Sequence, residues 1–145
     1  EGSFRPSGDV HLGMAISLRG GGLVAPAIHH ADRCDLDTLM RTLSDLVKRA
    51  RTGGLRSSEL SDPTITVTNL GEGIVDAVYP VIYPPQVAMI GLGSVMRRPW
   101  ILDDAIVPRR LIQVTVAADH RVSDGHRAAR FLETLRQLLA EPDKL

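Results

Sequence analysis

A histidine stands between two acidic residues in the run Asp-His-Arg-Val-Ser-Asp-Gly at positions 119–125. Imidazole can gain and lose a proton near neutral pH without help from its surroundings, so His120 is a candidate general base. Asp124 could cap a following helix, and Gly125 permits a tight turn. A second interpretation stays open on the same residues, in which Asp119, Ser123 and Asp124 build a polar turn and His120 merely lies in it.

The patterns on either side of this motif predict the elements that hold it. Residues 111–118 alternate like a strand, and from Ala128 onward apolar residues recur at offsets 0, 3, 4, 7, 10 and 11, which is the period of a helix. A short polar link between a buried strand and a helix can present a reactive side chain on a rigid frame. We therefore expect His120 to lie between a strand and a helix.

The rest of the chain predicts a further helix and several strands. Residues 35–52 carry one apolar face, with Asp35 as the expected N-cap and Gly53 as the stop. Pro26 favours an edge or a bulge for the second of the predicted strands. The expected strands are 10–18, 23–28, 64–71, 86–93 and a hairpin of 96–102 with 105–108 around Asp103-Asp104. Residues 1–9 are expected to be a disordered lead-in to a single domain at 10–145.

Composition excludes several classes of function. The 145 residues carry 17 Lys plus Arg and 17 Asp plus Glu, so no basic excess favours a nucleic-acid or membrane partner. No apolar stretch is long enough to span a bilayer, and no secretory signal opens the chain. The single cysteine, Cys34, provides neither a disulfide nor a metal cluster, which suits a reducing cytoplasm.

Four segments carry a family pattern in a fixed order. They are Gly-Leu-Val-Ala-Pro-Ala-Ile at 22–28, Thr-Asn-Leu-Gly at 68–71, Pro-Pro-Gln-Val-Ala at 84–88 and His-Arg-Val-Ser-Asp-Gly at 120–125. Together they resemble the catalytic domain of dihydrolipoamide acyltransferases, the core subunits of 2-oxo acid dehydrogenase complexes. The resemblance runs from Val10 to Leu145 but lacks the segment that normally opens that domain, so we expect a C-terminal part of it.

The resemblance implies a fold and roles for three residues. The fold would be α/β, similar to chloramphenicol acetyltransferase, with a mixed sheet and helices packed mainly on one face. His120 would be the general base toward the thiol of coenzyme A, or of dihydrolipoamide in reverse. The hydroxyl of Thr68 would stabilise the oxyanion, and Asp124 would fix the loop around His120 through an arginine outside this chain. No metal is expected, and the residues that bind coenzyme A stay unassigned.

The same resemblance implies an assembly. We expect a homotrimer that builds a larger core, with His120 and Thr68 facing each other across the interface between chains. The lipoyl group would be carried on a separate domain, and the decarboxylase and dehydrogenase subunits of the complex would be partners. The location would be the cytoplasm, or the mitochondrial matrix in a eukaryote.

Two other functions stay open at this point. A chloramphenicol-type acetyltransferase would use the same His-x-x-x-Asp-Gly pattern, although Arg121 and the Thr-Asn-Leu-Gly segment favour the lipoamide group. A non-catalytic assembly module would keep the fold alone, which the presence of both His120 and Thr68 disfavours. The residue before Asp-His-Arg is the small Ala118. In this it resembles the members of the family that handle branched-chain acyl groups, which tend to carry a small residue there.

Overall fold

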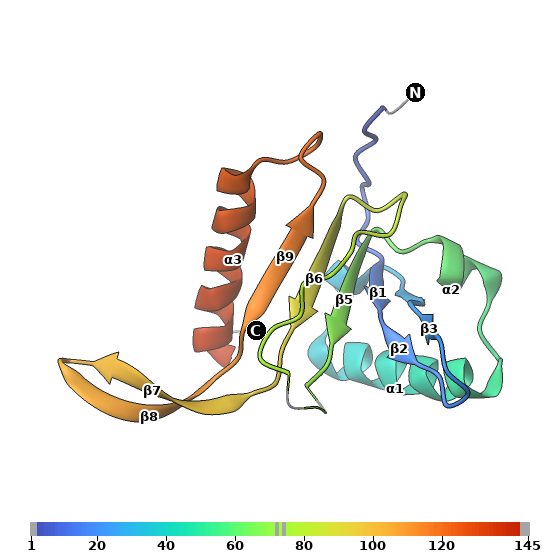
Figure 1. The fold of residues 1–145 in the computed structure, drawn as a ribbon. Coiled ribbons are helices and arrows are strands. Elements are labelled where there is room, and N and C mark those ends of the chain that lie inside the picture. The colour runs from blue at the N-terminus through green and yellow to red at the C-terminus, as the bar shows by residue number, and fades with distance from the viewer. Residues whose placement is uncertain (1–2, 72, 74, 143–145) are drawn as a thin grey trace.

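A five-stranded mixed sheet forms the centre of the computed structural model, which describes residues 3–71, 73 and 75–142. Strands β1, β5 and β6 run parallel to one another, and β4 and β9 flank them antiparallel in the order β4-β1-β5-β6-β9 (Figure 1). Their bounds are Leu12–Met14 for β1, Ala27–Ile28 for β4, Ile65–Asn69 for β5, Ala88–Leu92 for β6 and Val114–Ala118 for β9.

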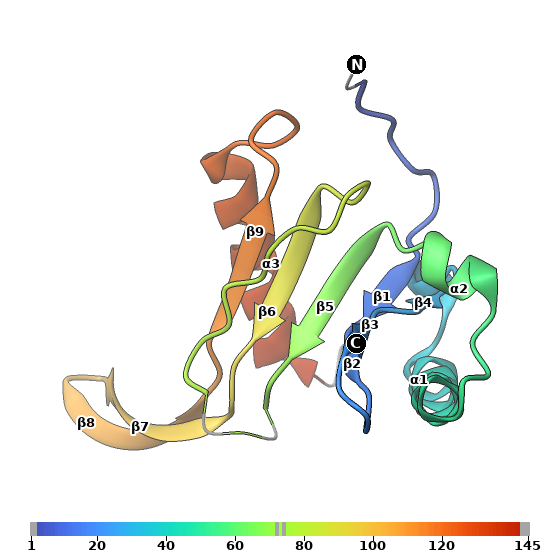
Figure 2. The ribbon, with the colours of Figure 1, turned by 45° about the vertical axis from the view of Figure 1, so that its right-hand side comes forward.

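Two long helices lie on the same face of this sheet, α1 (Leu36–Thr52) near β1 and β4 and α3 (Gly125–Ala140) near β9 (Figures 1 and 2). A short helix α2 (Ser57–Ser61) and a 3-10 turn η1 (Ala31–Arg33) lie next to α1 along the chain. The predicted α/β fold, with helices mainly on one face of a mixed sheet, is confirmed. No helix among the described residues is long and apolar enough to cross a membrane.

The two faces of the sheet differ in character. Register pairs place Ile90 opposite Val67 on one side and Val116 on the other, which makes an apolar face for the helices. On the opposite face the loop between β5 and β6 crosses the strands in front of the sheet (Figure 1). There Thr66, only 2% exposed, donates its hydroxyl hydrogen to Gln86 Oε1 at 2.8 Å. A buried hydroxyl needs a hydrogen-bond partner, so polar groups are buried between this face of the sheet and the loop.

The strands predicted at 10–18 and 23–28 are each broken in two, so the prediction of unbroken strands was wrong. The first divides into β1 and β2 (Ile16–Ser17), and the second into β3 (Leu23–Val24) and β4. Strands β2 and β3 pair only with each other, in a separate two-stranded sheet. Pro26 interrupts the second run, because its ring nitrogen has no hydrogen to donate to a ladder.

Helix α1 begins and ends as the sequence predicts. The Asp35 carboxylate accepts the Thr38 N–H at 2.7 Å, and Gly53 ends the helix at a positive φ of 77°. Leu46 and Ala50 bring the helix into the buried cluster that also holds Ile16 and Ile28. This cluster is the core between α1 and the strands β2 and β4, and its burial holds α1 against that half of the sheet.

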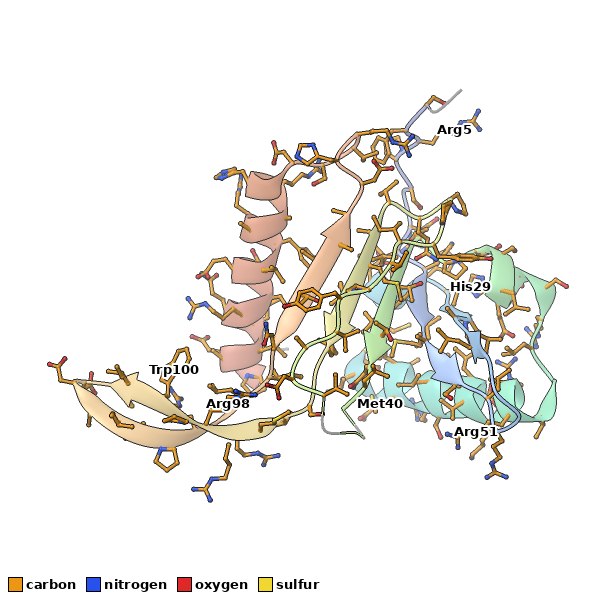
Figure 3. All side chains as sticks on the ribbon, viewed as in Figure 1. Arg5, His29, Met40, Arg51, Arg98 and Trp100 are labelled. Carbon is orange, nitrogen blue, oxygen red and sulfur yellow. The ribbon has the colours of Figure 1, made fainter. Side chains whose placement is uncertain are left out.

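A long hairpin extends away from the body of the molecule (Figure 1). It consists of β7 (Met96–Leu102) and β8 (Ala105–Leu111), with Asp103 and Asp104 at the turn as predicted. The sequence predicted an end at Pro108, whereas β8 continues to Leu111. Strand β8 pairs only with β7, so each of these strands has an outer edge, and an edge is where a proline in a strand is tolerated. Trp100 and Arg98 project from this hairpin (Figure 3), and Arg98 pairs with Asp76 of the loop at 2.5 Å.

The segment before β1 is coil that contacts the body of the domain. Asp9 accepts a hydrogen bond from Arg33 Nη2 at 2.6 Å, and its carboxylate lies 3.2 Å from the His30 ring. Residues 1–2, part of the lead-in expected at 1–9, lie outside the described residues. The boundary between a disordered lead-in and a domain at 10–145 stays a prediction.

Candidate active site

His120 lies in the link between β9 and α3, as the flanking patterns predict. The link covers residues 119–124, and the His120 side chain is exposed. Its imidazole makes no hydrogen bond within the described part of the chain. An imidazole in this state is open to a proton donor that approaches from outside.

Asp124 is the N-cap of α3. Its Oδ1 accepts the Arg127 N–H at 2.8 Å, so the carboxylate faces the first turn of the helix rather than the imidazole. The prediction that Asp124 caps the helix is confirmed. Its predicted role in fixing the loop through an arginine outside this chain stays a prediction.

Asp119 holds the backbone of the link. Its N–H donates to the Val87 carbonyl at 2.8 Å, which ties the end of β9 to the start of β6. Its own carbonyl accepts the N–H groups of Val122 and Ser123, at 2.9 and 3.0 Å. Three backbone hydrogen bonds therefore converge on the residue that precedes His120.

The side chain of Asp119 also closes a ring with Arg121. Oδ1 accepts the Arg121 backbone N–H at 2.9 Å, while Nε and Nη2 of the guanidinium lie 3.0 Å from Oδ1 and 2.7 Å from Oδ2. The hydrogen bonds from the guanidinium, and to a smaller extent the one from the Arg121 backbone N–H, lower the pKa of Asp119 to about 2. They also raise the pKa of Arg121. The pair is therefore charged throughout the pH range in which imidazole titrates.

Thr68 differs from the other threonines of its face of the sheet. Thr66 donates to Gln86, and Thr115 donates to the Val78 carbonyl. The hydroxyl of Thr68 has no hydrogen-bond partner within residues 3–71, 73 and 75–142. Gly91 lies opposite both Thr68 and Thr115, and a Cβ there would approach the Val78 carbonyl oxygen to 2.5 Å. Thr68 thus keeps a hydroxyl that is free to donate.

His120 and Thr68 are not brought together within one chain. The register places Thr68 level with Gly91 and with Thr115, five positions before His120. At roughly 3.3 Å per residue, this separates them by about 16 Å along the strands. One chain therefore does not provide a general base and an oxyanion donor at one point.

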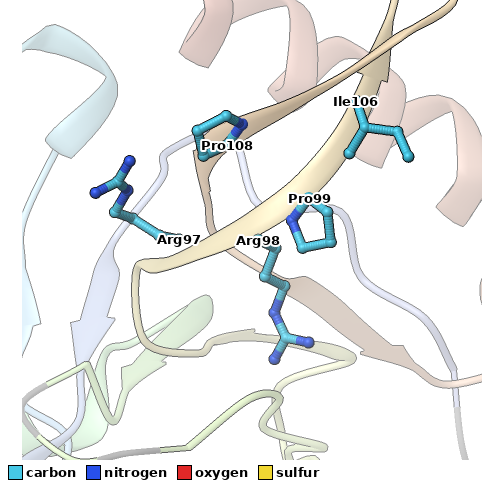
Figure 4. Close-up of a pocket in the computed structure, with 5 residues that line it drawn as sticks. All are labelled: Arg97, Arg98, Pro99, Ile106 and Pro108. Atoms are coloured by element: carbon cyan, nitrogen blue, oxygen red, sulfur yellow. The ribbon is translucent and has the colours of Figure 1, made fainter.

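Three hollows lie near these elements. One, of about 780 Å³, borders the link at Asp119, Arg121 and Val122 and reaches residues 3–5 and 84–87. A second, of about 470 Å³, lies on the hairpin and is lined by Arg97, Arg98, Pro99, Ile106 and Pro108 (Figure 4). A third, of about 500 Å³, lies at the start of α3 and is lined by Asp124, His126, Arg127, Arg130, Phe131 and Thr134. Of the three predicted site residues, Asp124 lines the third hollow, and His120 and Thr68 line none of the three. The described residues contain no group of three or more side chains arranged to hold a metal ion.

Sequence reasoning missed the pairing of Asp119 with Arg121. It placed Asp119 in a polar turn, which is right, but gave its carboxylate no partner. The signal was present, because an acidic residue at the end of a strand with an arginine two positions later can fold back on itself.

Comparison with known proteins identifies a family pattern over the whole chain. The model of the 2-oxoacid dehydrogenases acyltransferase (catalytic domain) family matches residues 1–145. The chain is 38% identical over 136 residues to the dihydrolipoyllysine-residue acetyltransferase component of the acetoin cleaving system from Bacillus subtilis, which covers 94% of this chain and 34% of that protein. It is also 38% identical over 140 residues to a lipoamide acyltransferase component of the branched-chain alpha-keto acid dehydrogenase complex from Pseudomonas aeruginosa, covering 95% of this chain and 32% of the relative.

Solved structures match the fold closely. A probable dihydrolipoamide acetyltransferase from Listeria monocytogenes superposes with a TM-score of 0.89 at 29% identity, over 93% of this chain and 57% of the other. The cubic core of a pyruvate dehydrogenase multienzyme complex gives a TM-score of 0.88 at 30% identity, over 93% and 55%. The chain thus spans about a third of these curated relatives and somewhat more than half of these solved chains.

Proposed function

The chain belongs to the family of 2-oxoacid dehydrogenase acyltransferase catalytic domains, and from this we propose that it transfers an acyl group between a dihydrolipoyl group and coenzyme A. The observation that supports this most strongly is the exposed, unpartnered His120, held between β9 and α3 in a chain that matches the family over residues 1–145. Both substrates are thiols, and a thiol is a poor nucleophile until it loses its proton.

In the proposed mechanism, neutral His120 takes the proton from the attacking thiol. The thiolate sulfur forms a bond to the thioester carbonyl carbon, and the carbonyl oxygen becomes an oxyanion. Collapse of this tetrahedral intermediate breaks the original carbon–sulfur bond. The departing thiolate then receives the proton from the imidazolium of His120, so the enzyme returns to its starting state.

Thr68 is the proposed donor to the oxyanion. Its hydroxyl has no partner within the described residues, and one donor of this kind is worth about 3 kcal/mol of transition-state stabilisation. Because Thr68 and His120 lie about 16 Å apart along the strands of one chain, the proposal requires His120 from one copy and Thr68 from another. This supports a site at the interface between copies of the chain, and the family resemblance adds that the assembly is a homotrimer.

The partners follow from the same proposal. The lipoyl group would arrive on a separate domain, and coenzyme A would be the second substrate. The names of the relatives, which belong to acetoin, pyruvate and branched-chain systems, support a core that works with decarboxylase and dehydrogenase subunits. We place this assembly in the cytoplasm, or in the mitochondrial matrix of a eukaryote.

An acceptor assay tests this function. The full-length protein is incubated with acetyl-coenzyme A and either dihydrolipoamide or chloramphenicol, and products are identified by mass spectrometry. We expect S-acetyldihydrolipoamide and free coenzyme A, with no acetyl ester of chloramphenicol. Ester formation would support the antibiotic-modifying alternative. Absence of both products, from a protein that assembles as oligomers, would favour a non-catalytic assembly module.

A further inference from the structure

The two neighbours of His120 in the link, Asp119 and Arg121, contact each other and so close a ring around it. Asp119, before it, accepts the Val122 and Ser123 N–H groups at its carbonyl and the Arg121 N–H at Oδ1. Arg121, after it, returns its guanidinium to the Asp119 carboxylate through hydrogen bonds of 3.0 and 2.7 Å. The backbone of His120 therefore runs through a loop whose two ends are joined by side-chain as well as main-chain contacts.

This ring matters because the imidazole has no hydrogen-bond partner among the described residues to orient it. His120 makes no hydrogen bond within the described residues, so the direction of its ring depends on its backbone and on steric contacts. Arg121 keeps 85% of its side chain exposed, whereas the Asp119 side chain is 20% exposed. An ion pair exposed to this degree contributes little to the free energy of unfolding. Its effect is therefore sought in the geometry of the loop.

We infer that Asp119 and Arg121 are positioning residues for acyl transfer, because together they fix the backbone on both sides of His120 and hence the direction of its imidazole. This inference rests on the proposed function. It differs from a binding role for Arg121, in which the exposed guanidinium would contact an anionic group of coenzyme A. It differs also from an ordinary surface ion pair.

The chain contains a matched control. Glu133 and Arg136 on α3 make the same kind of two-point pair, with Nη2–Oε1 at 2.7 Å and Nε–Oε2 at 2.9 Å. Both residues are exposed and lie well along α3 from the link. Substitutions in this pair remove equivalent contacts without touching the loop around His120.

The experiment compares Asp119→Asn, Arg121→Ala and Arg121→Lys with Glu133→Gln and Arg136→Ala in the full-length protein. We measure kcat, KM for each thiol substrate, thermal unfolding and amide exchange at Val122 and Ser123. We expect Asp119→Asn and Arg121→Ala to lower kcat about 10- to 100-fold, as small misplacements of a catalytic group do, with KM for coenzyme A within about threefold. Arg121→Lys should recover part of kcat, the two link amides should exchange faster, and the control variants should match the wild type.

Three outcomes overturn the inference. If kcat stays within about twofold in both variants, the pair is a surface ion pair without a positioning role. If KM for coenzyme A rises while kcat is kept, Arg121 binds substrate instead. If amide exchange at Val122 and Ser123 is unchanged, the pair does not hold the loop. Arg121 is largely exposed, so its variants carry the test even where Asp119→Asn fails to fold.

Failure of the proposed function gives a different result. In that case the wild-type protein transfers no acyl group, and neither kcat nor KM can be measured for any variant. The amide exchange comparison still tells whether Asp119 and Arg121 order the link. The two conclusions therefore stand or fall on separate measurements.

Discussion

Thr68 and His120 belong to opposite ends of the same sheet. Thr68 stands near the end of β5, level with Thr115 near the start of β9, whereas His120 follows the last residue of β9. Strand β9 runs antiparallel to β6, so its far end carries His120 away from Thr68. Two side chains separated in this way can act on one thioester only when they come from different chains.

Mixed assemblies provide a direct test of this arrangement. Full-length His120→Ala and Thr68→Ala proteins, each impaired alone, are unfolded, combined and refolded together. We expect activity to return, because some interfaces then pair an intact His120 of one copy with an intact Thr68 of the next. The measurement is the rate of S-acyldihydrolipoamide formation per mole of mixed oligomer.

The control is each variant refolded by itself, with native mass spectrometry to prove that the mixed sample contains both chains. If both residues act within one chain, no mixed oligomer holds an intact site. Recovery would then be absent despite proven mixing, and the interface proposal would be wrong.

His120→Ala should lower kcat by roughly 100- to 10,000-fold, the usual contribution of a general base. Folding should be little changed, since the side chain is exposed and makes no hydrogen bond within the described residues. His126→Ala is the matched control variant, because His126 is also exposed and lies at the second position of α3. Equal activity of the two variants in the dihydrolipoamide assay would remove His120 from the mechanism.

Much of the fold could be predicted from sequence because its signals are local. Asp35 and Gly53 mark the ends of α1, and Asp103-Asp104 marks the hairpin turn, each through a backbone preference of the residue itself. The break between β3 and β4 also has a local cause, because Pro26 cannot donate to a ladder. The break between β1 and β2 could not be predicted in the same way. It depends on which strand each half pairs with, and pairing partners are distant in sequence.

The candidate site shows the same division. The place of His120 between a strand and a helix followed from periodicity alone. The spacing of Asp119 and Arg121 allowed their pairing, but only the path of the loop shows that the two side chains meet. The role of Thr68 came only from family resemblance. The structure adds that the Thr68 hydroxyl has no partner in the described residues, while those of Thr66 and Thr115 are satisfied.

The acyl preference should follow the size of residue 118. Ala118 is half-buried at the end of β9 and pairs with another small residue, Ala88. We expect the wild type to have a higher kcat/KM with isobutyryl- than with acetyl-coenzyme A. An added methylene in an apolar pocket is worth about 1–3 kcal/mol, so Ala118→Phe should reverse the preference by tenfold or more. A clear preference of the wild type for acetyl groups would contradict this prediction.

Acid should weaken the contact between α1 and α2. The guanidinium of Arg49 holds the buried Glu59 through hydrogen bonds of 2.7 Å and lowers its pKa from an ordinary 4.5 to about 2. A depressed carboxyl pKa contributes stability that is complete above the unfolded value and is lost as the pH falls through the folded value. The contribution of this pair should therefore decline between about pH 5 and pH 2.

Glu59→Gln measures this contribution. At pH 7 it should lower the free energy of unfolding by about 2 kcal/mol, less than for a fully buried pair because Arg49 keeps 27% of its side chain exposed. The difference between wild type and variant should shrink as the pH is lowered to 2, as followed by denaturant titration. A difference that stays constant with pH would mean that the charge of Glu59 is not the stabilising feature.

Two aspartates with the same capping geometry separate stability from catalysis. Asp35 accepts the Thr38 N–H at 2.7 Å and Asp124 accepts the Arg127 N–H at 2.8 Å, each at the start of a long helix. Asp35→Ala should lower Tm by a few degrees and leave acyl transfer unchanged, since α1 packs near β4, at the opposite edge of the sheet from β9 and the link. Asp124→Ala should lower Tm by a similar amount and also reduce kcat, because the start of α3 anchors the end of the loop that carries His120. Thermal unfolding and dihydrolipoamide kinetics on both variants make the comparison. If Asp124→Ala loses stability but no more activity than Asp35→Ala, then Asp124 is a helix cap alone.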